Sequence, residues 1–238
     1  MSGREEILAR IREALQGSKA LAGRVSFPDA GKVLAPIPPG ELVERFEEEL
    51  KAVAGCCHRA RSKPDLEKIL REILPASGGA SVVFSRNPIF DRLPVLQILE
   101  HMNCSVARWP GAGEVEEDAR EMFRKSCFSA TAGITGVDFA LAESGTLVLS
   151  SAAEGTQLAS LAPSIHIAFY TRPQVVESLE EVLEQVFPAR TVKEEKDGRS
   201  VVFVTGVSRT SDIEQVSIRG VHGPTSLHAI LAEDACFD

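Results

Sequence analysis

The chain has 238 residues, of which 44% are hydrophobic, 25% are charged and only 5% are aromatic. This length and balance are typical of a globular protein whose sizeable core consists mainly of aliphatic side chains. The formal net charge of −8 argues against sequence-independent binding of nucleic acid, which requires clustered basic residues. The sequence shows no apolar stretch long enough for a membrane span and no signal-peptide pattern, so we expect a cytoplasmic protein.

The five cysteines show no spacing that would hold a metal ion or an iron–sulfur cluster. Two of them are adjacent and three are isolated, so none forms the C-x-x-C pattern of zinc ribbons and clusters. They are Cys56, Cys57, Cys104, Cys127 and Cys236. We therefore expect reduced thiols and no metal or cofactor in this chain, and any redox work would need a cofactor or a partner.

The N-terminal part of the sequence predicts a helical arm. Apolar residues recur at helical spacing within residues 2–16, and residues 17–39 are rich in Gly, Pro and Ala, as in a connector. Residues 40–54 predict a second, amphipathic helix. We place the arm and its linker in residues 1–60 and an α/β domain in residues 61–238.

The remaining sequence alternates helical and strand patterns. Such alternation predicts an α/β domain with a mainly parallel sheet covered by helices. The predicted helices are residues 65–74, 93–102, 114–125 and 175–187. The predicted strands are residues 80–85, 104–109, 164–170 and 200–205, followed by a last strand after residue 225. Apolar neighbours flank His166 in its strand, so we interpret it as a structural histidine.

Residues 133–151 predict two strands folded on each other. Two apolar runs are separated by the polar sequence Glu143, Ser144, Gly145 and Thr146. Glu143 therefore sits at the bend of a hydrophobic pair. Its carboxylate is either solvated at the turn or held in a cleft, where it could act chemically.

A second polar stretch, residues 206–214, follows the strand predicted at residues 200–205. It carries Ser208, Arg209, Asp212 and Glu214. Free backbone N–H groups after a strand favour an anion, and the Arg209 guanidinium could clamp a carboxylate or phosphate with two donors. The alternative is a simple helix start, capped by a side chain of this stretch.

A third stretch precedes the last strand. His222 stands before Gly-Pro on a tight bend, and bends between elements expose their side chains. Histidine is the side chain best suited to proton transfer near neutral pH. The alternative is a turn histidine bonded to the backbone.

Four motifs together, GITGVDFALAESGTLVL, LAPSIHIAF, TGVSRTSDIEQ and GVHGPTSLHAILAED, resemble the LUD-domain family of lactate-utilisation proteins, in particular its C component. The resemblance covers residues 131–233, whereas the N-terminal half matches in layout alone. It implies a fold similar to the phosphosugar isomerase and coenzyme A transferase group. The sequence has Ala-Glu-Ser-Gly-Thr where Ala-Glu-Thr-Gly-Thr is common in the family, a change that keeps a hydroxyl group.

The same resemblance implies a role in carbohydrate metabolism. Family members take part in a three-component system that oxidises L-lactate to pyruvate, in which the other components carry the iron–sulfur motifs. We accordingly expect iron–sulfur clusters in partner subunits, and a role for this chain in binding a small carboxylate or a partner. Two alternatives are a stand-alone enzyme resembling coenzyme A transferases, with Glu143 as nucleophile, and a phosphosugar isomerase with Glu143 or Asp138 as base.

The predicted site brings together three loops that are distant in the sequence. Its candidate catalytic residues are Glu143 and His222. Its candidate ligand-binding residues are Ser144, Gly145, Thr146, Ser208, Arg209, Asp212 and Glu214. The prediction requires these loops to converge at one edge of the sheet. A homo-oligomer is a separate expectation for the assembly.

Overall fold

The computed structural model describes residues 3–18, 36–75, 79–110, 117–186, 200–211, 217–220 and 222–237. The chain divides into two compact units, Met1–Pro36 and Ile37–Asp238. Within the first unit, α1 spans Gly3–Ser18, which confirms the predicted N-terminal helix. No helix in the described ranges is long and apolar enough to cross a membrane.

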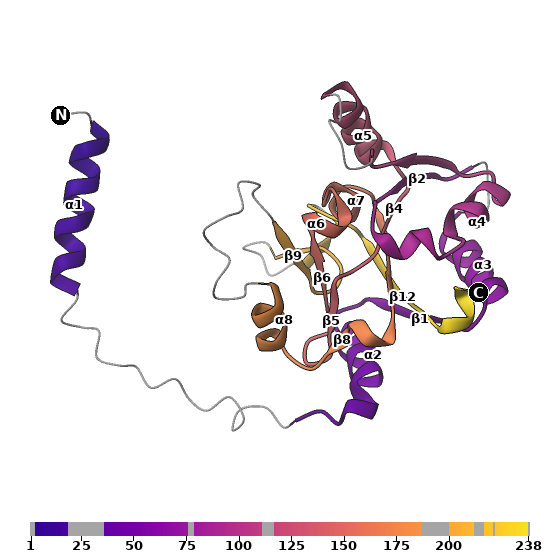
Figure 1. The fold of residues 1–238 in the computed structure, drawn as a ribbon. Helices are drawn as coiled ribbons and strands as arrows, with labels where there is room; N and C mark the ends of the chain where they lie inside the picture. The colour runs from indigo at the N-terminus through magenta and orange to yellow at the C-terminus, as the bar shows by residue number, and fades with distance from the viewer. Residues whose placement is uncertain are drawn as a thin grey trace. The chain divides into compact units, whose positions relative to one another are not determined.

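Six parallel strands form the main sheet of the second unit (Figure 1). Their order is β1-β12-β7-β4-β2-β3, and every neighbouring pair runs in the same direction. The strands are β1 (Cys56–Ala60), β2 (Ser81–Phe84), β3 (Ser105–Arg108), β4 (Ala132–Thr135), β7 (Ile165–Tyr170) and β12 (Ser226–Ala232). The predicted α/β class with a parallel sheet is confirmed.

A second sheet of four strands lies beside this core, in the order β8-β5-β6-β9. Its strands are β5 (Phe139–Leu141), β6 (Thr146–Ser150), β8 (Val175–Val176) and β9 (Val201–Val204). Strands β5 and β6 are antiparallel, which confirms the predicted hairpin and its bend at Glu143. The strand expected to be buried at residues 200–205 is instead the edge strand β9, where Phe203 is 42% exposed.

Two further predicted elements differ from the structure. The helix expected over residues 175–187 begins only at Leu179, because Val175 and Val176 pair with β5 as the short strand β8. The polar stretch after β9 forms strand β10 (Arg209–Ser211), which pairs antiparallel with β11 (Ser217–Arg219). In the described part of this stretch no helix begins, and residues Arg209–Ser211 pair with β11.

Helices and the small sheet cover the two faces of the main sheet. The helices of the second unit are α2 (Leu42–Ala52), α3 (Lys63–Ile73), α4 (Val95–His101), α5 (Glu117–Ser129), α6 (Ser151–Glu154), α7 (Leu158–Leu161) and α8 (Leu179–Val186). Apolar residues of α3 and α4 pack on one face, and both helices lie on the same side of the sheet in Figure 1. The opposite face packs against α2, α5, α7 and the small sheet.

Helix α2 and strand β1 belong to the α/β unit. Phe46 and Leu50 of α2 are fully buried in the core between the two sheets, and β1 pairs along its whole length with β12. The compact α/β unit begins at Ile37, whereas the sequence predicts an arm and linker that extend to residue 60. The amphipathic pattern of residues 40–54 indicates a helix but not the surface on which its apolar face packs.

We predict that Phe46→Ala lowers the free energy of unfolding by about 3–5 kcal/mol, because it leaves a cavity between α2 and the sheet. The matched control is Phe128→Ala on α5, where the ring is 67% exposed and its loss should cost less than about 1 kcal/mol. Urea unfolding followed by circular dichroism measures both variants. Equal losses in the two variants would contradict the placement of α2 in the core.

Candidate functional site

The strand order places a topological switch point between β2 and β4. From β2 the chain moves outward to β3, whereas from β4 it moves in the opposite direction to β7 and then β12. In open α/β sheets, ligands bind outside the carboxyl ends of the strands at the point where the order reverses. The segments that follow β2 and β4 are therefore the first place to look for a functional site.

Glu154, the last residue of α6, is buried at this switch point with a side chain that is 0% exposed. The Asn87 amide, which follows β2, donates a hydrogen bond to Oε1 of Glu154. The backbone N–H of Arg86 donates to the Glu154 carbonyl oxygen at 3.2 Å. Oε2 of Glu154 has no hydrogen-bond partner. The site thus holds a buried carboxyl group with one fixed oxygen and one unpaired oxygen.

Gly136, directly after β4, allows the Asn87 amide to approach this closely. A Cβ atom at Gly136 would lie 2.3 Å from the Asn87 amide carbon, which is closer than real side-chain contacts allow. The Asn87 side chain is fixed from its own segment as well, because Oδ1 accepts a hydrogen bond from the Ile89 N–H at 3.0 Å. The Asn87–Glu154 contact is therefore rigidly positioned.

Burial sets the electrostatics of the site. It raises the pKa of Glu154 to about 7, an effect opposed by Ser85 and Asn87 and increased by the charge of Asp138. Burial also raises the pKa of Asp138, against hydrogen bonds from Ser150 N–H at 2.6 Å and Ser150 Oγ at 3.2 Å. A carboxyl group with a pKa near neutrality can accept or release a proton under physiological conditions.

Polar side chains continue under α6 and α7 along the same face of the sheet. Thr135 Oγ1 at the end of β4 lies 2.8 Å from His166 Nε2 on β7, and Nδ1 of His166 has no partner. Burial lowers the pKa of His166 to about 3, so its ring is neutral. The buried polar residues of this part of the fold are Ser85, Asn87, Thr135, Glu154, Ser160 and His166.

The predicted first loop lies at the bend of β5 and β6. The Glu143 carboxylate accepts a hydrogen bond from the Leu179 N–H at 2.8 Å, so it satisfies the first turn of α8. Hydroxyl groups continue from the bend to the next strand, with Ser144 Oγ 2.8 Å from Thr146 Oγ1 and Thr146 Oγ1 2.7 Å from Thr205 Oγ1. Gly145 takes a φ of +62°, which the tight bend requires.

The second and third predicted loops meet each other. The Ser208 N–H donates to the Pro224 carbonyl at 3.0 Å, and the Ser208 carbonyl accepts from the Gly220 N–H at 3.0 Å. The side chains of Arg209 and His222 are exposed. Asp212 and Glu214 lie outside the described residues.

The three loops are joined only in part. Thr146 of the first loop contacts Thr205, which lies three residues before Ser208 of the second. In the part of the chain that the structure describes, no hydrogen bond or ion pair joins Glu143 to Ser208, Arg209 or His222. The third loop reaches the second through Ser208, so the observed junction is between these two loops.

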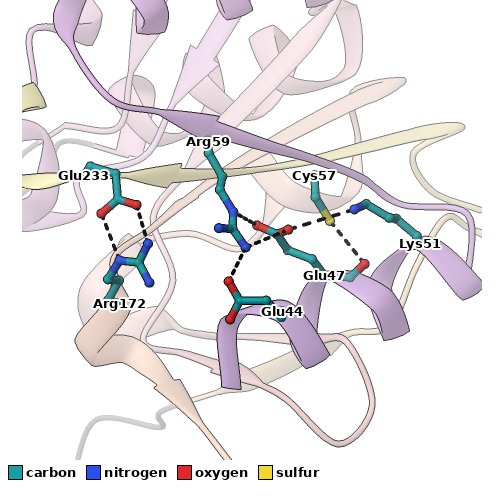
Figure 2. Close-up of polar contacts among 7 residues, drawn as sticks. All are labelled: Glu44, Glu47, Lys51, Cys57, Arg59, Arg172 and Glu233. Carbon is teal, nitrogen blue, oxygen red and sulfur yellow. Dashed lines mark hydrogen bonds and ion pairs between the residues drawn. The ribbon is translucent and has the colours of Figure 1, made fainter. Parts of the chain in front are cut away.

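A second polar cluster occupies the other end of the same sheet edge (Figure 2). Arg59 near the end of β1 donates to Glu47 on α2 at 2.7 Å and to Glu44 at 2.9 Å. Arg172, after β7, binds Glu233, after β12, at 2.6 Å and 3.0 Å. Each charge therefore meets an opposite charge, as expected for structural ion pairs. Among the described side chains, no group of three or more His, Cys, Asp and Glu residues could hold a metal ion.

Comparison with known proteins assigns the family. The sequence profile of the LUD domain matches residues 43–232. The chain belongs to the LUD-domain family. A LUD-family relative from Deinococcus radiodurans, named Lactate utilization protein C, is 36% identical over 95% of this chain and 93% of its own length. A second, from Bacillus subtilis and of the same name, is 29% identical over 98% of each chain.

A solved structure supports the LUD fold independently. The crystal structure of a DUF162 family protein from Deinococcus radiodurans aligns with 83% of this chain and with all of that chain, at a TM-score of 0.56 and 24% identity. This likeness shows the fold alone. The similarity to phosphosugar isomerases and coenzyme A transferases stays a prediction.

Sequence reasoning missed most of this LUD-domain switch-point site. Glu154 lies in the short sequence SSAAEG, which shows neither helical periodicity nor a run of polar residues. Asn87 follows a predicted strand, and the strand-end rule applied there would have singled it out. Asp138 was considered only as an alternative base. No local signal shows that Glu154 and Asn87, 67 residues apart, meet in space.

We predict that Glu154 makes the free energy of unfolding depend on pH. Its ordinary pKa of 4.5 applies in the unfolded chain and a value of about 7 in the folded one, so the folded state binds more protons between these values and loses stability as pH rises through them. Glu154→Gln removes this loss. Between pH 5 and 8, the unfolding free energy should fall by about 3 kcal/mol more in the natural protein than in the variant.

Chemical denaturation at a series of pH values measures this difference. Glu100→Gln on the exposed surface of α4 is the matched control, and its profile should follow that of the natural protein. Parallel profiles for Glu154→Gln and the natural protein would show that Glu154 titrates in the ordinary range.

We predict that Arg59→Ala lowers the free energy of unfolding by about 2 kcal/mol or more, because it leaves the buried Glu47 carboxylate without its main partner. The matched control is Arg71→Ala, which breaks the exposed ion pair with Glu67 on α3 and should cost less than about 1 kcal/mol. Thermal and urea unfolding compare the two. A smaller loss for Arg59→Ala than for Arg71→Ala would contradict a structural role for the cluster in Figure 2.

Proposed function

We propose that this LUD-domain protein is one component of a multi-component system that oxidises L-lactate to pyruvate. The observation that carries the proposal is its similarity, over nearly the whole of both chains, to relatives named Lactate utilization protein C. In this proposal the chain binds a small carboxylate or a partner, and the electrons pass through iron–sulfur clusters in partner subunits.

The burial and the separate placement of two cysteines support the assignment of the iron–sulfur clusters to partner subunits. Burial raises the pKa of Cys57 to about 12 and that of Cys127 to about 11, so both thiols are protonated at neutral pH. Cys57 lies on β1 and Cys127 on α5, on separate elements. Redox centres in this system are therefore better sought in the partners.

The surface at the second and third loops suits a partner. Ser208 ties the β10 segment to the bend that carries His222, and Arg209 and His222 are both exposed there. Exposed Arg and His side chains on connected loops offer hydrogen-bond donors to a facing subunit. We therefore assign Arg209 and His222 to partner contact in this proposal.

The switch point suits a small carboxylate. The Arg86 guanidinium donates one hydrogen bond from Nη2 to the Ala152 carbonyl at 2.9 Å, and a guanidinium has five N–H donors in all. Its side chain is half-buried beside α6. A planar cation at the carboxyl ends of β2 and β4 is a suitable partner for a carboxylate ligand.

Reconstitution tests the proposal. The chain and its partner subunits are purified separately, and pyruvate formation from L-lactate is measured with an artificial electron acceptor. We expect turnover with all components, a loss of at least tenfold when this chain is omitted, and none with this chain alone. Full turnover without the chain, or turnover by the chain alone, would contradict its role as one component.

A further inference from the structure

The unpaired oxygen of Glu154 is the feature that the fold itself does not explain. A buried polar atom without a hydrogen bond is costly, because it has lost its water and gained nothing in return. Oε2 is in this position although Oε1 of the same carboxylate is paired with Asn87. The Ser85 hydroxyl and the Gly136 N–H approach the carboxyl group and lower its pKa, yet neither makes a hydrogen bond to Oε2. Oε2 is therefore the atom at which a bound molecule would complete the hydrogen bonding of this carboxyl group.

The surroundings of Glu154 point to a polar occupant. The Ser85 hydroxyl lies close enough to the Glu154 carboxyl group to lower its pKa. The Arg86 side chain runs along α6, and its Cδ would lie 3.1 Å from a Cβ atom at Gly155. Gly155 thus leaves room first for the Trp109 ring, whose Cδ1 would lie 2.3 Å from that Cβ, and also for the Arg86 side chain. The charged group that acts on the carboxyl is Asp138, from the segment after β4, whereas the Arg86 guanidinium lies along α6 at the Ala152 carbonyl.

We propose that the switch point binds a small 2-hydroxycarboxylate, with Oε2 of Glu154 hydrogen-bonded to its hydroxyl group and Arg86 pairing with its carboxylate. The inference rests on the proposed function, because L-lactate is the 2-hydroxycarboxylate of that system. It adds the residues and the part of the ligand that each one recognises. Asn87 is a positioning residue, because it fixes the carboxyl group through Oε1.

Protonation of Glu154 would favour this binding. In the neutral carboxyl group Oε1 accepts from Asn87, so the proton is on Oε2, which donates to the ligand's hydroxyl oxygen. This neutral group does not repel the ligand's carboxylate, whereas an ionised one beside Asp138 adds a second negative charge. With a Glu154 pKa of about 7, affinity should fall as pH rises through neutrality. The hydroxyl preference and the pH dependence thus depend on the same residue, and the carboxylate requirement depends on Arg86.

The test compares L-lactate with propionate, which has the same carbon chain without the hydroxyl group, by calorimetry or ligand-observed NMR on the purified full chain at pH 6. We expect L-lactate to bind at least about tenfold more tightly than propionate, since a site built for a hydroxyl rejects the analogue that lacks it. Glu154→Leu should abolish this preference. Arg86→Gln should lower the affinities for L-lactate and propionate by about the same factor. The control Glu100→Leu should leave both affinities unchanged.

A second measurement on the natural sequence covers the case in which Glu154→Leu does not fold. In protein labelled with ¹³C at the glutamate carboxyl groups, L-lactate should shift the titration of one buried carboxyl and propionate should not. Equal affinities for the two ligands, no binding of L-lactate, or a hydroxyl preference that survives in Glu154→Leu would overturn the assignment.

The outcome is independent of the reconstitution assay. If omission of the chain stops pyruvate formation but the purified chain shows no hydroxyl preference, the ligand assignment fails and the proposed function stands. If the chain prefers L-lactate but its omission has no effect on turnover, the proposed function fails and the binding site stands.

Discussion

The all-parallel pairing of six strands is the constraint on which the rest of the molecule depends. Parallel strands bring all their carboxyl ends to one edge, and a sheet covered on both faces must be joined by connections that cross from one end to the other. Because the connections leave β2 and β4 in opposite directions, the covering layers part between these two strands. Ser85, Asn87 and Gly136 lie there because of the strand order.

The two ends of this edge use charge differently. At β1 and β12, Arg59 and Arg172 are matched by carboxylates, so the charges hold α2 and the strand ends together (Figure 2). At β2 and β4, one carboxyl group is buried with half of its hydrogen-bonding capacity unused. The first arrangement is complete within the chain, whereas in our proposal a bound 2-hydroxycarboxylate completes the second.

The sequence predicted the elements whose signal is local. Continuous apolar runs identified β2 and β7, and the hairpin of β5 and β6 followed from its polar bend. It did not predict which sheet each run joins, because β9 is as apolar as β2 and only its pairing with β6 makes it an edge strand. Nor did it place α2, whose apolar face fits an arm or a core equally well.

Two glutamates of the candidate site, Glu143 and Glu154, show most clearly what the local sequence does not predict. Glu143 follows an apolar strand and drew attention because it interrupts a hydrophobic pair, yet its carboxylate caps the start of α8. Glu154 sits in an unremarkable Ala-rich turn, and its chemistry arises from burial and from Asn87, 67 residues away. Local sequence gives the identity of a carboxyl group but not its solvation, and solvation decides whether that group is a cap or a proton acceptor. For that reason the family could be recognised from motifs, while the residues best suited to chemistry emerged only from the packing around the switch point.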